Sequence, residues 1–174
     1  MGIMGVMGTV WLTDEQQRAW RAYLRMQARL TAELNRQLQA ESGLSLPDYE
    51  VLVQLTDAPA GRLRPYELQK LLEWEQSRLS HHLARMQRRD LIARQECHDD
   101  ARGAYIAITG TGREAITAAA PGHVDTVRRL FFDHLDGDQV RLVEQLSGGV
   151  LAALDQPPSR KGTRRARRPG PQGR

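Results

Sequence analysis

Apolar residues recur at helical spacing through most of this chain, and the period changes to alternation in only one region. Thr13 and Gln16 form a capping box before a long amphipathic stretch that ends near Ala40. Pro47 suits the first turn of a second helix, and Pro121 is expected to kink or break a later one. Further helices are expected over residues 64–74, 75–89, 113–120, 124–135 and 139–154. The pattern predicts a mainly helical protein.

The alternating region lies directly after the helix expected over residues 75–89. Two strand-like runs, 91–96 and 105–109, enclose a polar loop, which predicts a small β-hairpin. The helix before it places apolar residues on one side and polar or basic residues on the other. Such a helix can enter the major groove of DNA, and a hairpin beside it can reach the neighbouring minor groove. The order of short helix, basic helix and hairpin therefore predicts a winged helix-turn-helix.

Contacts to DNA are expected on the exposed side of residues 75–89 and at the tip of the hairpin. Arg102 is the only guanidinium of the loop and is expected to contact DNA, a salt bridge to Asp99 or Asp100 being the alternative. Arg85, Arg88 and Arg89 suit phosphate contacts or intramolecular pairs better than base reading. The contacts expected on the helix are Gln76, Ser77, Arg78, Ser80, His81 and Arg85, a merely solvated helix face being the alternative.

Charge is distributed unevenly along the chain. The net charge is +4, but residues 159–174 carry seven Lys or Arg and no acid, which leaves 18 bases against 21 acids elsewhere. This tail, rich in Pro, Gly and Arg, is expected to be disordered and either to favour polyanions such as DNA or to be simply solvated. No apolar window is long enough to span a bilayer, and the single cysteine, Cys97, fits a reducing cytosol. A cytoplasmic protein is expected.

Several motifs resemble the MarR family of bacterial transcriptional regulators. The resemblance rests on LSLPDYEVLVQL, ELQKLL and SRLSHHLARMQRRDLI, and extends from about Trp11 to Leu154. Its most specific piece is Asp100-x-Arg102, five residues and then Ile108-Thr109, with Gly112-Arg113 after it. The resemblance implies that Asp100 braces the wing and that Arg102 enters the minor groove. Glu73-Trp74 and Asp90 stand where the family usually has Gly, and the Asp90 position requires a positive φ.

The family likeness also implies an assembly and a ligand. It implies a homodimer, joined through the N- and C-terminal helices, that reads a pseudo-palindrome in double-stranded DNA. It implies a small aromatic effector in a cleft between the dimer helices and the winged domain, with Tyr23, Met26, Tyr49 and Leu63 as candidate lining. The expected domains are a flexible leader (1–12), an N-terminal dimerisation helix (13–46), the winged helix-turn-helix domain (47–109), C-terminal dimerisation helices (110–156) and the basic tail (157–174).

The function expected from the sequence is a ligand-responsive repressor, and two alternatives stay open. One is a helical interaction protein that has kept the fold and lost DNA binding, and the other is a redox-sensing regulator that uses Cys97. No nucleophile elbow, P-loop or dinucleotide fingerprint is present, so neither an enzyme nor a cofactor is expected. His81 and His82 point in different directions on a helix and, with His98, lack a metal-ligand spacing, so no metal is expected.

Overall fold

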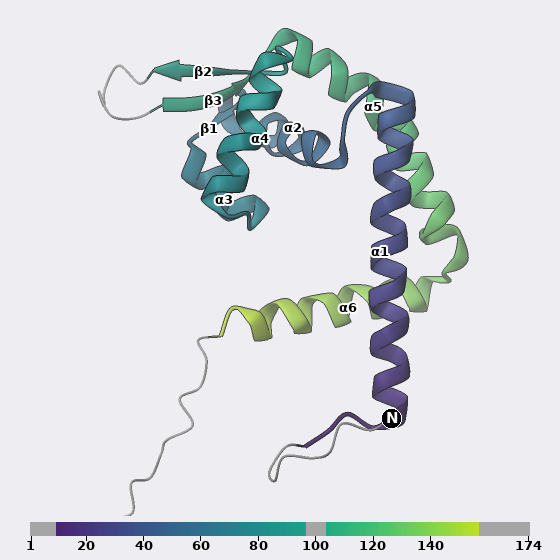
Figure 1. The fold of residues 1–174 in the computed structure, drawn as a ribbon. Coiled ribbons are helices and arrows are strands. Elements are labelled where there is room, and N and C mark those ends of the chain that lie inside the picture. Colours follow the sequence, from purple (N-terminus) through teal and green to yellow (C-terminus); the bar gives the residue numbers. More distant parts are fainter. Residues whose placement is uncertain (1–9, 97–103, 157–174) are drawn as a thin grey trace, which may run out of the picture. The chain divides into compact units, whose positions relative to one another are not determined.

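The computed structural model describes residues 10–96 and 104–156, and the chain forms two compact units, Met1–Phe131 and Phe132–Arg174. In the first unit three helices and a short strand precede the helix and hairpin of the wing, and one long helix follows them (Figure 1). Its elements are α1 (Asp14–Ser42), α2 (Leu46–Asp57), a 3-10 turn (Pro59–Gly61), β1 (Arg62–Leu63), α3 (Pro65–Leu72), α4 (Gln76–Arg88), β2 (Ile92–Glu96), β3 (Ala104–Ile108) and α5 (Gly110–Leu130). The second unit contains a 3-10 turn (Phe132–His134) and α6 (Gly137–Leu154).

Side-chain caps fix where the helices begin. The capping box expected at Thr13 is confirmed, because the Gln16 amide donates to the Thr13 hydroxyl and the Thr13 amide donates to the Gln16 side chain. Equivalent boxes start α2 at Ser45 and α6 at Asp136. Each box satisfies backbone donors that the first turn of a helix leaves without partners.

The hairpin expected from the alternating pattern is present, but the sheet contains a third strand that the sequence analysis missed. β2 and β3 pair antiparallel, and Ile92 lies opposite Ile108. β1 pairs with the other edge of β3, giving the order β1-β3-β2. A strand of two residues is too short to show alternation, so no sequence pattern could reveal it.

The helix break expected at Pro121 is wrong, because α5 continues from Gly110 to Leu130 across it. Figure 1 shows α5 changing direction near the middle of its length, which corresponds to the kink that was the other expectation. α5 packs along α1 and α2, and these tertiary contacts stabilise a helix that has lost one backbone donor.

Two tight junctions of the winged region use the left-handed backbone conformation without glycine. Glu73, the C-cap of α3, has a φ of 53°, and Asp90, just before β2, has a φ of 55°. The positive φ expected at Asp90 is therefore confirmed. Thr111 donates a hydrogen bond to the Asp90 carboxylate and Thr109 donates one to the Asp90 carbonyl, which stabilises this junction against the start of α5.

One apolar core joins α2 to the elements around it. Large side chains that are fully buried come from α1, α2, α3, α4 and the α1–α2 connection: Leu38, Leu44, Val51, Leu52, Leu55, Leu68 and Met86. Burial of such a side chain contributes about 1.5–3 kcal/mol each. Because α4 contributes Met86 and the sheet contributes Ile106 and Ile108 to the same core, the helix and the wing are held by one packed body.

Two helices keep large apolar surfaces exposed within the described part of the chain. In the first unit α1 exposes Trp20, Tyr23, Leu24 and Met26. In the second unit α6 has no buried residue and exposes Val140, Leu142, Leu146, Val150, Leu151 and Leu154. Contiguous apolar surface of this kind marks an interaction site rather than a solvated face. No helix among the described residues has the length and apolar character needed to span a membrane.

Candidate nucleic-acid interface

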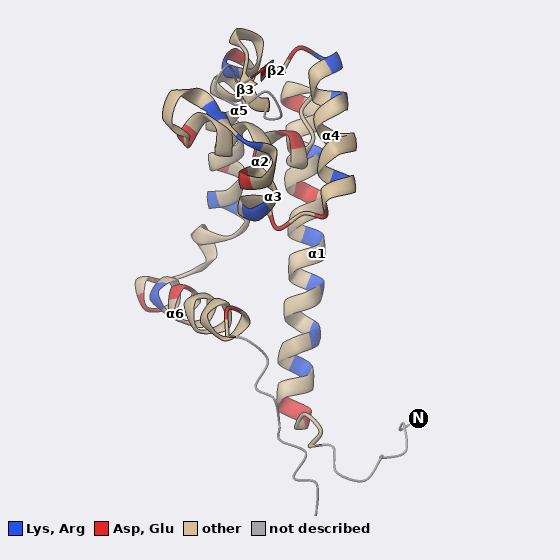
Figure 2. Cartoon of the chain, turned by 90° about the vertical axis from the view of Figure 1, so that its left-hand side faces the viewer, with Lys and Arg blue, Asp and Glu red and all other residues tan. Residues whose placement is uncertain are grey.

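α4 presents a narrow polar stripe away from the core. Leu79, His82, Leu83 and Met86 are its buried residues. Ser77, His81, Ala84 and Arg88 follow each other at helical spacing on the opposite side, and all four are exposed. Figure 2 shows basic segments recurring along α4. A helix anchored on one side, with short polar and basic groups on the other, has the form needed to read a major groove.

The other residues expected to contact DNA lie on the two flanks of this stripe. Gln76 and Ser80 are exposed and line a hollow between α4 and the sheet. On the other flank, the Arg78 guanidinium lies 4.3 Å from the centre of the Trp74 ring, and the Arg85 guanidinium lies 2.8 Å from His82 Nδ1. Arg78 and Arg85 therefore already pack against the protein, as the intramolecular alternative for Arg85 anticipated.

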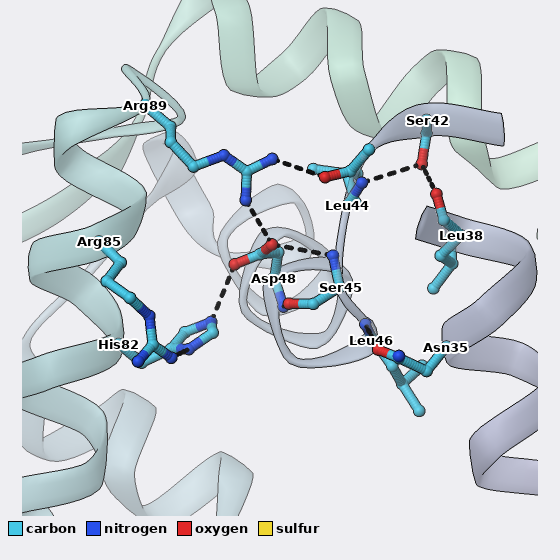
Figure 3. Close-up of polar contacts among 11 residues, drawn as sticks. Asn35, Leu38, Ser42, Leu44, Ser45, Leu46, Asp48, His82, Arg85 and Arg89 are labelled. Atoms are coloured by element: carbon cyan, nitrogen blue, oxygen red, sulfur yellow. Dashed lines mark hydrogen bonds and ion pairs between the residues drawn. The ribbon is translucent and has the colours of Figure 1, made fainter. Parts of the chain in front are cut away.

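A buried carboxylate connects α4 to α2. Asp48 is 3% exposed, and one of its oxygens lies 3.0 Å from His82 Nε2 (Figure 3). Arg89 donates to the other oxygen at 2.7 Å and donates its second nitrogen to the Gly43 carbonyl at 2.7 Å. The backbone amide of Ser45 also donates to Asp48. The middle of α4, through His82, and the C-terminal end of α4, through Arg89, are thus both attached to the start of α2.

The surroundings of Asp48 keep its carboxyl group ionised. Burial alone would raise the pKa, but hydrogen bonds from His82, Ser45 and Arg89 outweigh it and hold the pKa of Asp48 far below its usual range. The Arg85 guanidinium lies 2.8 Å from His82 Nδ1, and His82 Nε2 lies 3.0 Å from an Asp48 oxygen. The network is therefore an ionised carboxylate held by an arginine, with the His82 imidazole between Asp48 and Arg85.

Sequence reasoning missed Asp48, His82 and Arg89 as a unit. The role of Asp48 in the capping box with Ser45 was readable from their three-residue spacing. The contact to Arg89 spans 41 residues, and no local pattern encodes it. The intramolecular alternative for Arg89 is the one that the structure shows.

A second hollow lies between α2, the end of α3 and α5. It encloses about 480 Å³ and is lined by Leu46, Tyr49, Glu50, Val53, Gln54, Leu71, Leu72, Trp74 and His123. The rings of Tyr49 and His123 lie 4.4 Å apart, and burial raises the pKa of Tyr49 and lowers that of His123. Of the four residues expected to line an effector cleft, Tyr49 lies here. Tyr23 and Met26 are exposed on α1, and Leu63 packs against the core from β1.

Three residues singled out from the sequence, Cys97, Asp100 and Arg102, lie outside the described residues, as do positions 157–174 of the tail. Within residues 10–96 and 104–156, no three side chains of His, Cys, Asp or Glu are grouped as a metal site would require.

Comparisons with known proteins agree with this geometry. Residues 44–103 match the sequence profile described as the MarR family. The structure is similar to Sco3205 from Streptomyces coelicolor, a MarR family transcriptional regulator solved in complex with DNA: 38% identity, TM-score 0.80, 85% of this chain and 96% of that chain covered. AbsC from the same organism, another MarR family transcriptional regulator, is 36% identical, with a TM-score of 0.80 and coverage of 84% and 98%.

A more distant likeness shows the fold alone. PcaV from Streptomyces coelicolor, solved with its natural ligand, is 18% identical, with a TM-score of 0.69 over 84% of this chain and 100% of that one. No curated protein sequence matches the chain significantly.

The arrangement of α3, α4 and the three-stranded sheet defines a winged helix-turn-helix protein. Similarity to Sco3205 and AbsC, over nearly their whole lengths, makes the assignment specific. The chain belongs to the MarR family of transcriptional regulators.

Proposed function

We propose that this protein is a sequence-specific regulator that binds a pseudo-palindromic operator as a homodimer and represses transcription. The observation that carries the proposal is the exposed stripe of Ser77, His81, Ala84 and Arg88 on a helix fixed by a buried face and by Asp48. Sco3205, to which the chain is 38% identical, was solved in complex with DNA, which supports the same partner here.

The exposed apolar faces of α1 and α6 support the dimer. A chain that left Trp20 and Leu24 on α1, and Leu146 and Leu154 on α6, in water would carry large unburied apolar surfaces. A second copy offers the same surfaces, and homodimers commonly pair identical patches across a two-fold axis. Two copies also supply the two recognition helices that a palindromic site requires.

Selection of bound duplexes from a random library, followed by sequencing, tests the function. We expect enrichment of an inverted repeat. His81→Ala should relax the preference at one or two base pairs by about 1–3 kcal/mol each and leave the other positions unchanged. Arg129→Gln, an exposed change on α5, is the control and should select the same site. Failure of the wild-type chain to enrich any sequence would favour the alternative of a helical interaction protein.

The hollow beside Tyr49 and His123 supports a ligand-responsive regulator, and its chemistry suggests the kind of ligand. Glu50 is half-buried there, and burial raises its pKa while Arg78 and His82 oppose that rise. None of the described lining residues is Lys or Arg, so a ligand carboxylate would have no cationic partner. His123 Nδ1 is buried without a hydrogen-bond partner in the described part of the chain. A neutral aromatic ligand with a hydroxyl donor satisfies that atom.

Trp74 would connect this ligand to α4. It lines the hollow, carries Arg78 over its ring, and meets the His82 ring edge-on at a centroid distance of 5.2 Å. A ligand can shift α4 only if it binds one arrangement of these residues better than another.

Calorimetric titration with catechol and benzoate, each against the wild-type protein and His123→Phe, tests the ligand class. We expect catechol to bind the wild type and to bind His123→Phe about tenfold more weakly, because a buried hydrogen bond is lost. Benzoate should bind neither protein measurably. Equal binding of benzoate and catechol to the wild type would contradict the preference for a neutral ligand.

A further inference from the structure

The N-terminal half of α1 carries a row of arginines on one side. They follow each other at spacings of three or four residues, which places them on one face of the helix: Arg18, Arg21, Arg25 and Arg29. All four are exposed, no acid occurs between the first and the last, and Figure 2 shows basic segments recurring along this part of α1. At a rise of about 1.5 Å per residue this row, the arginine stripe, is about 16 Å long.

The charge of the arginine stripe is not compensated within the described part of the chain. Exposed arginines elsewhere on the helices, such as Arg36 and Arg141, form ion pairs with an acid three residues earlier. No stripe arginine forms an ion pair with an acid among residues 10–96 and 104–156. Arg25 instead lies four residues from both Arg21 and Arg29, and like charges at that spacing destabilise a helix. The stripe therefore indicates a binding surface rather than a contribution to the stability of α1.

The arginine stripe stays accessible in the proposed homodimer, because the apolar side chains of the same part of α1 lie on another face. Helical geometry directs Trp20 and Tyr23 roughly 140° and 160° away from Arg25. The two aromatic rings are stacked, with their centroids 5.7 Å apart. Burial of this apolar face against a second copy leaves the arginines in water.

The arginine stripe is also separate from the recognition helix. α1 is anchored in the core by Leu38, near its C-terminal end. Arg29 lies nine residues before Leu38, so the stripe begins about 13 Å along the helix from this anchor. Figure 1 shows the N-terminal half of α1 extending away from α4 and the sheet. The stripe is therefore a second cationic surface, distinct from the exposed side of α4.

A straight row of cations fits a straight polyanion. Duplex DNA carries one negative charge per about 1.7 Å of its axis, so a segment as long as the stripe presents about ten phosphates. Arginine matches phosphate oxygens through two parallel hydrogen bonds, and such contacts do not depend on sequence. A regulator bound at its operator has a large excess of other duplex segments around it. Duplex DNA is therefore the polyanion that the stripe meets most often.

We infer that the arginine stripe binds the phosphates of a second duplex segment, so that a dimer bound to its operator bridges two segments of DNA. The inference goes beyond the proposed function and rests on it only for the first of the two duplexes. Its second site reads charge alone, because no base-reading element lies between the arginines.

A bead assay tests the bridge. The selected operator duplex is immobilised, the full-length protein is bound to it, excess protein is washed away, and a labelled 30-base-pair duplex of random sequence is added. Both recognition helices are then engaged by the operator, so capture of the labelled duplex reports another surface. The basic tail is present in every protein compared, so capture by the tail alone would not depend on α1.

The test variant combines Arg21→Gln with Arg25→Gln, in the middle of the stripe. The control combines Arg36→Gln with Arg129→Gln and removes the same charge, but Arg36 is compensated by Glu33 and Arg129 is exposed on α5. Glutamine is a good helix former, and the test variant removes like-charged neighbours, so its stability and its dimer should be unchanged. Urea denaturation and light scattering check both.

We expect the test variant to capture the labelled duplex at least about tenfold more weakly than the wild type at about 0.1 M salt, because two phosphate contacts are lost. Its slope of log affinity against log salt should be lower by about 2, and the control should capture the duplex like the wild type. Equal capture by the test variant and the wild type, or operator retention without any capture, would overturn the inference and leave the proposed function intact. Failure of the wild type to stay on the operator would overturn the proposed function and the bridge with it.

Labelled poly-glutamate serves as a second probe, because an acidic protein surface is the other partner that a cationic row can bind. Tighter capture of poly-glutamate than of the duplex, lost in the test variant, would assign an acidic protein partner and overturn the second duplex. Loss of the dimer in the test variant would place the stripe in the dimer interface and overturn the inference as well.

Discussion

Replacing Asp48 with Asn is expected to lower the free energy of unfolding by about 3 kcal/mol and to weaken DNA binding on the order of tenfold. The substitution keeps an oxygen that can accept from the Ser45 amide, so the helix cap survives. It removes the negative charge that Arg89 and His82 share at 2.7 and 3.0 Å. Asp48 is buried whereas the Arg89 side chain is 44% exposed, so the cost arises from weakening contacts of charged groups to a buried acceptor rather than from leaving Arg89 buried and unpaired. Urea denaturation and duplex titration measure the two effects.

The control for Asp48→Asn is Asp125→Asn, which removes the carboxylate of an exposed pair with Arg128 at 3.8 Å. Exposed pairs contribute less than about 1 kcal/mol, so this variant should unfold like the wild type. Equal stability of Asp48→Asn and Asp125→Asn would contradict the anchoring role of the network.

The Asp48 effect should also depend on pH in one direction. Because folding lowers the pKa of this carboxyl group, its stabilisation is fully present above the unfolded value of about 3.9 and is lost as the pH falls towards the folded value. The stability difference between the wild type and Asp48→Asn should therefore be constant above about pH 5 and shrink below about pH 4. A difference that grew on acidification would have the wrong sign.

Replacing Gly112 with Ala is expected to lower the free energy of unfolding by about 3 kcal/mol or more. Gly112 is buried in the first turn of α5, and an added Cβ would lie closer than 3.0 Å to the Leu91 carbonyl oxygen. That oxygen belongs to backbone fixed by hydrogen bonds from Thr109 and by the start of β2, so it cannot move as a flexible side chain would. α5 would have to separate from the base of the wing.

Gly110→Ala is the matched control for Gly112→Ala. It lies two residues earlier in the same helix, and an added Cβ there meets no atom within 4 Å. We expect it to leave stability unchanged or to raise it by up to about 1 kcal/mol, because Ala favours the helix. Thermal unfolding of the two variants separates steric exclusion from glycine content. Similar melting temperatures for both would contradict the close approach.

The sequence predicted the elements whose patterns are local. Alternation located the hairpin, helical spacing located α4 with its buried and exposed sides, and the Thr13 cap marked the start of α1. β1 could not be predicted, because two residues show no period and pairing with β3 joins them to a strand more than 40 residues away. The continuity of α5 across Pro121 depends on packing against α1 and α2, which a local rule for proline does not include.

The residues of the candidate site also divide into those that a local pattern predicts and those that depend on tertiary contacts. The exposed positions of α4 follow from helical geometry, so Ser77 and His81 could be selected from sequence. The flank contacts of Arg78 and Arg85, and the buried state of His82, depend on Trp74 and Asp48 in three dimensions.

The central claim is that the dimer holds two recognition helices at the pitch of B-form DNA. Methylation protection on the selected duplex measures the spacing of these helices directly. Guanine N7 lies in the major groove, so a helix bound there protects it. We expect two protected clusters on one face of the duplex, centred about 10 base pairs apart and related by a dyad, with two chains bound per duplex. A single protected cluster with one chain bound, or two clusters on opposite faces of the duplex, would contradict the claim.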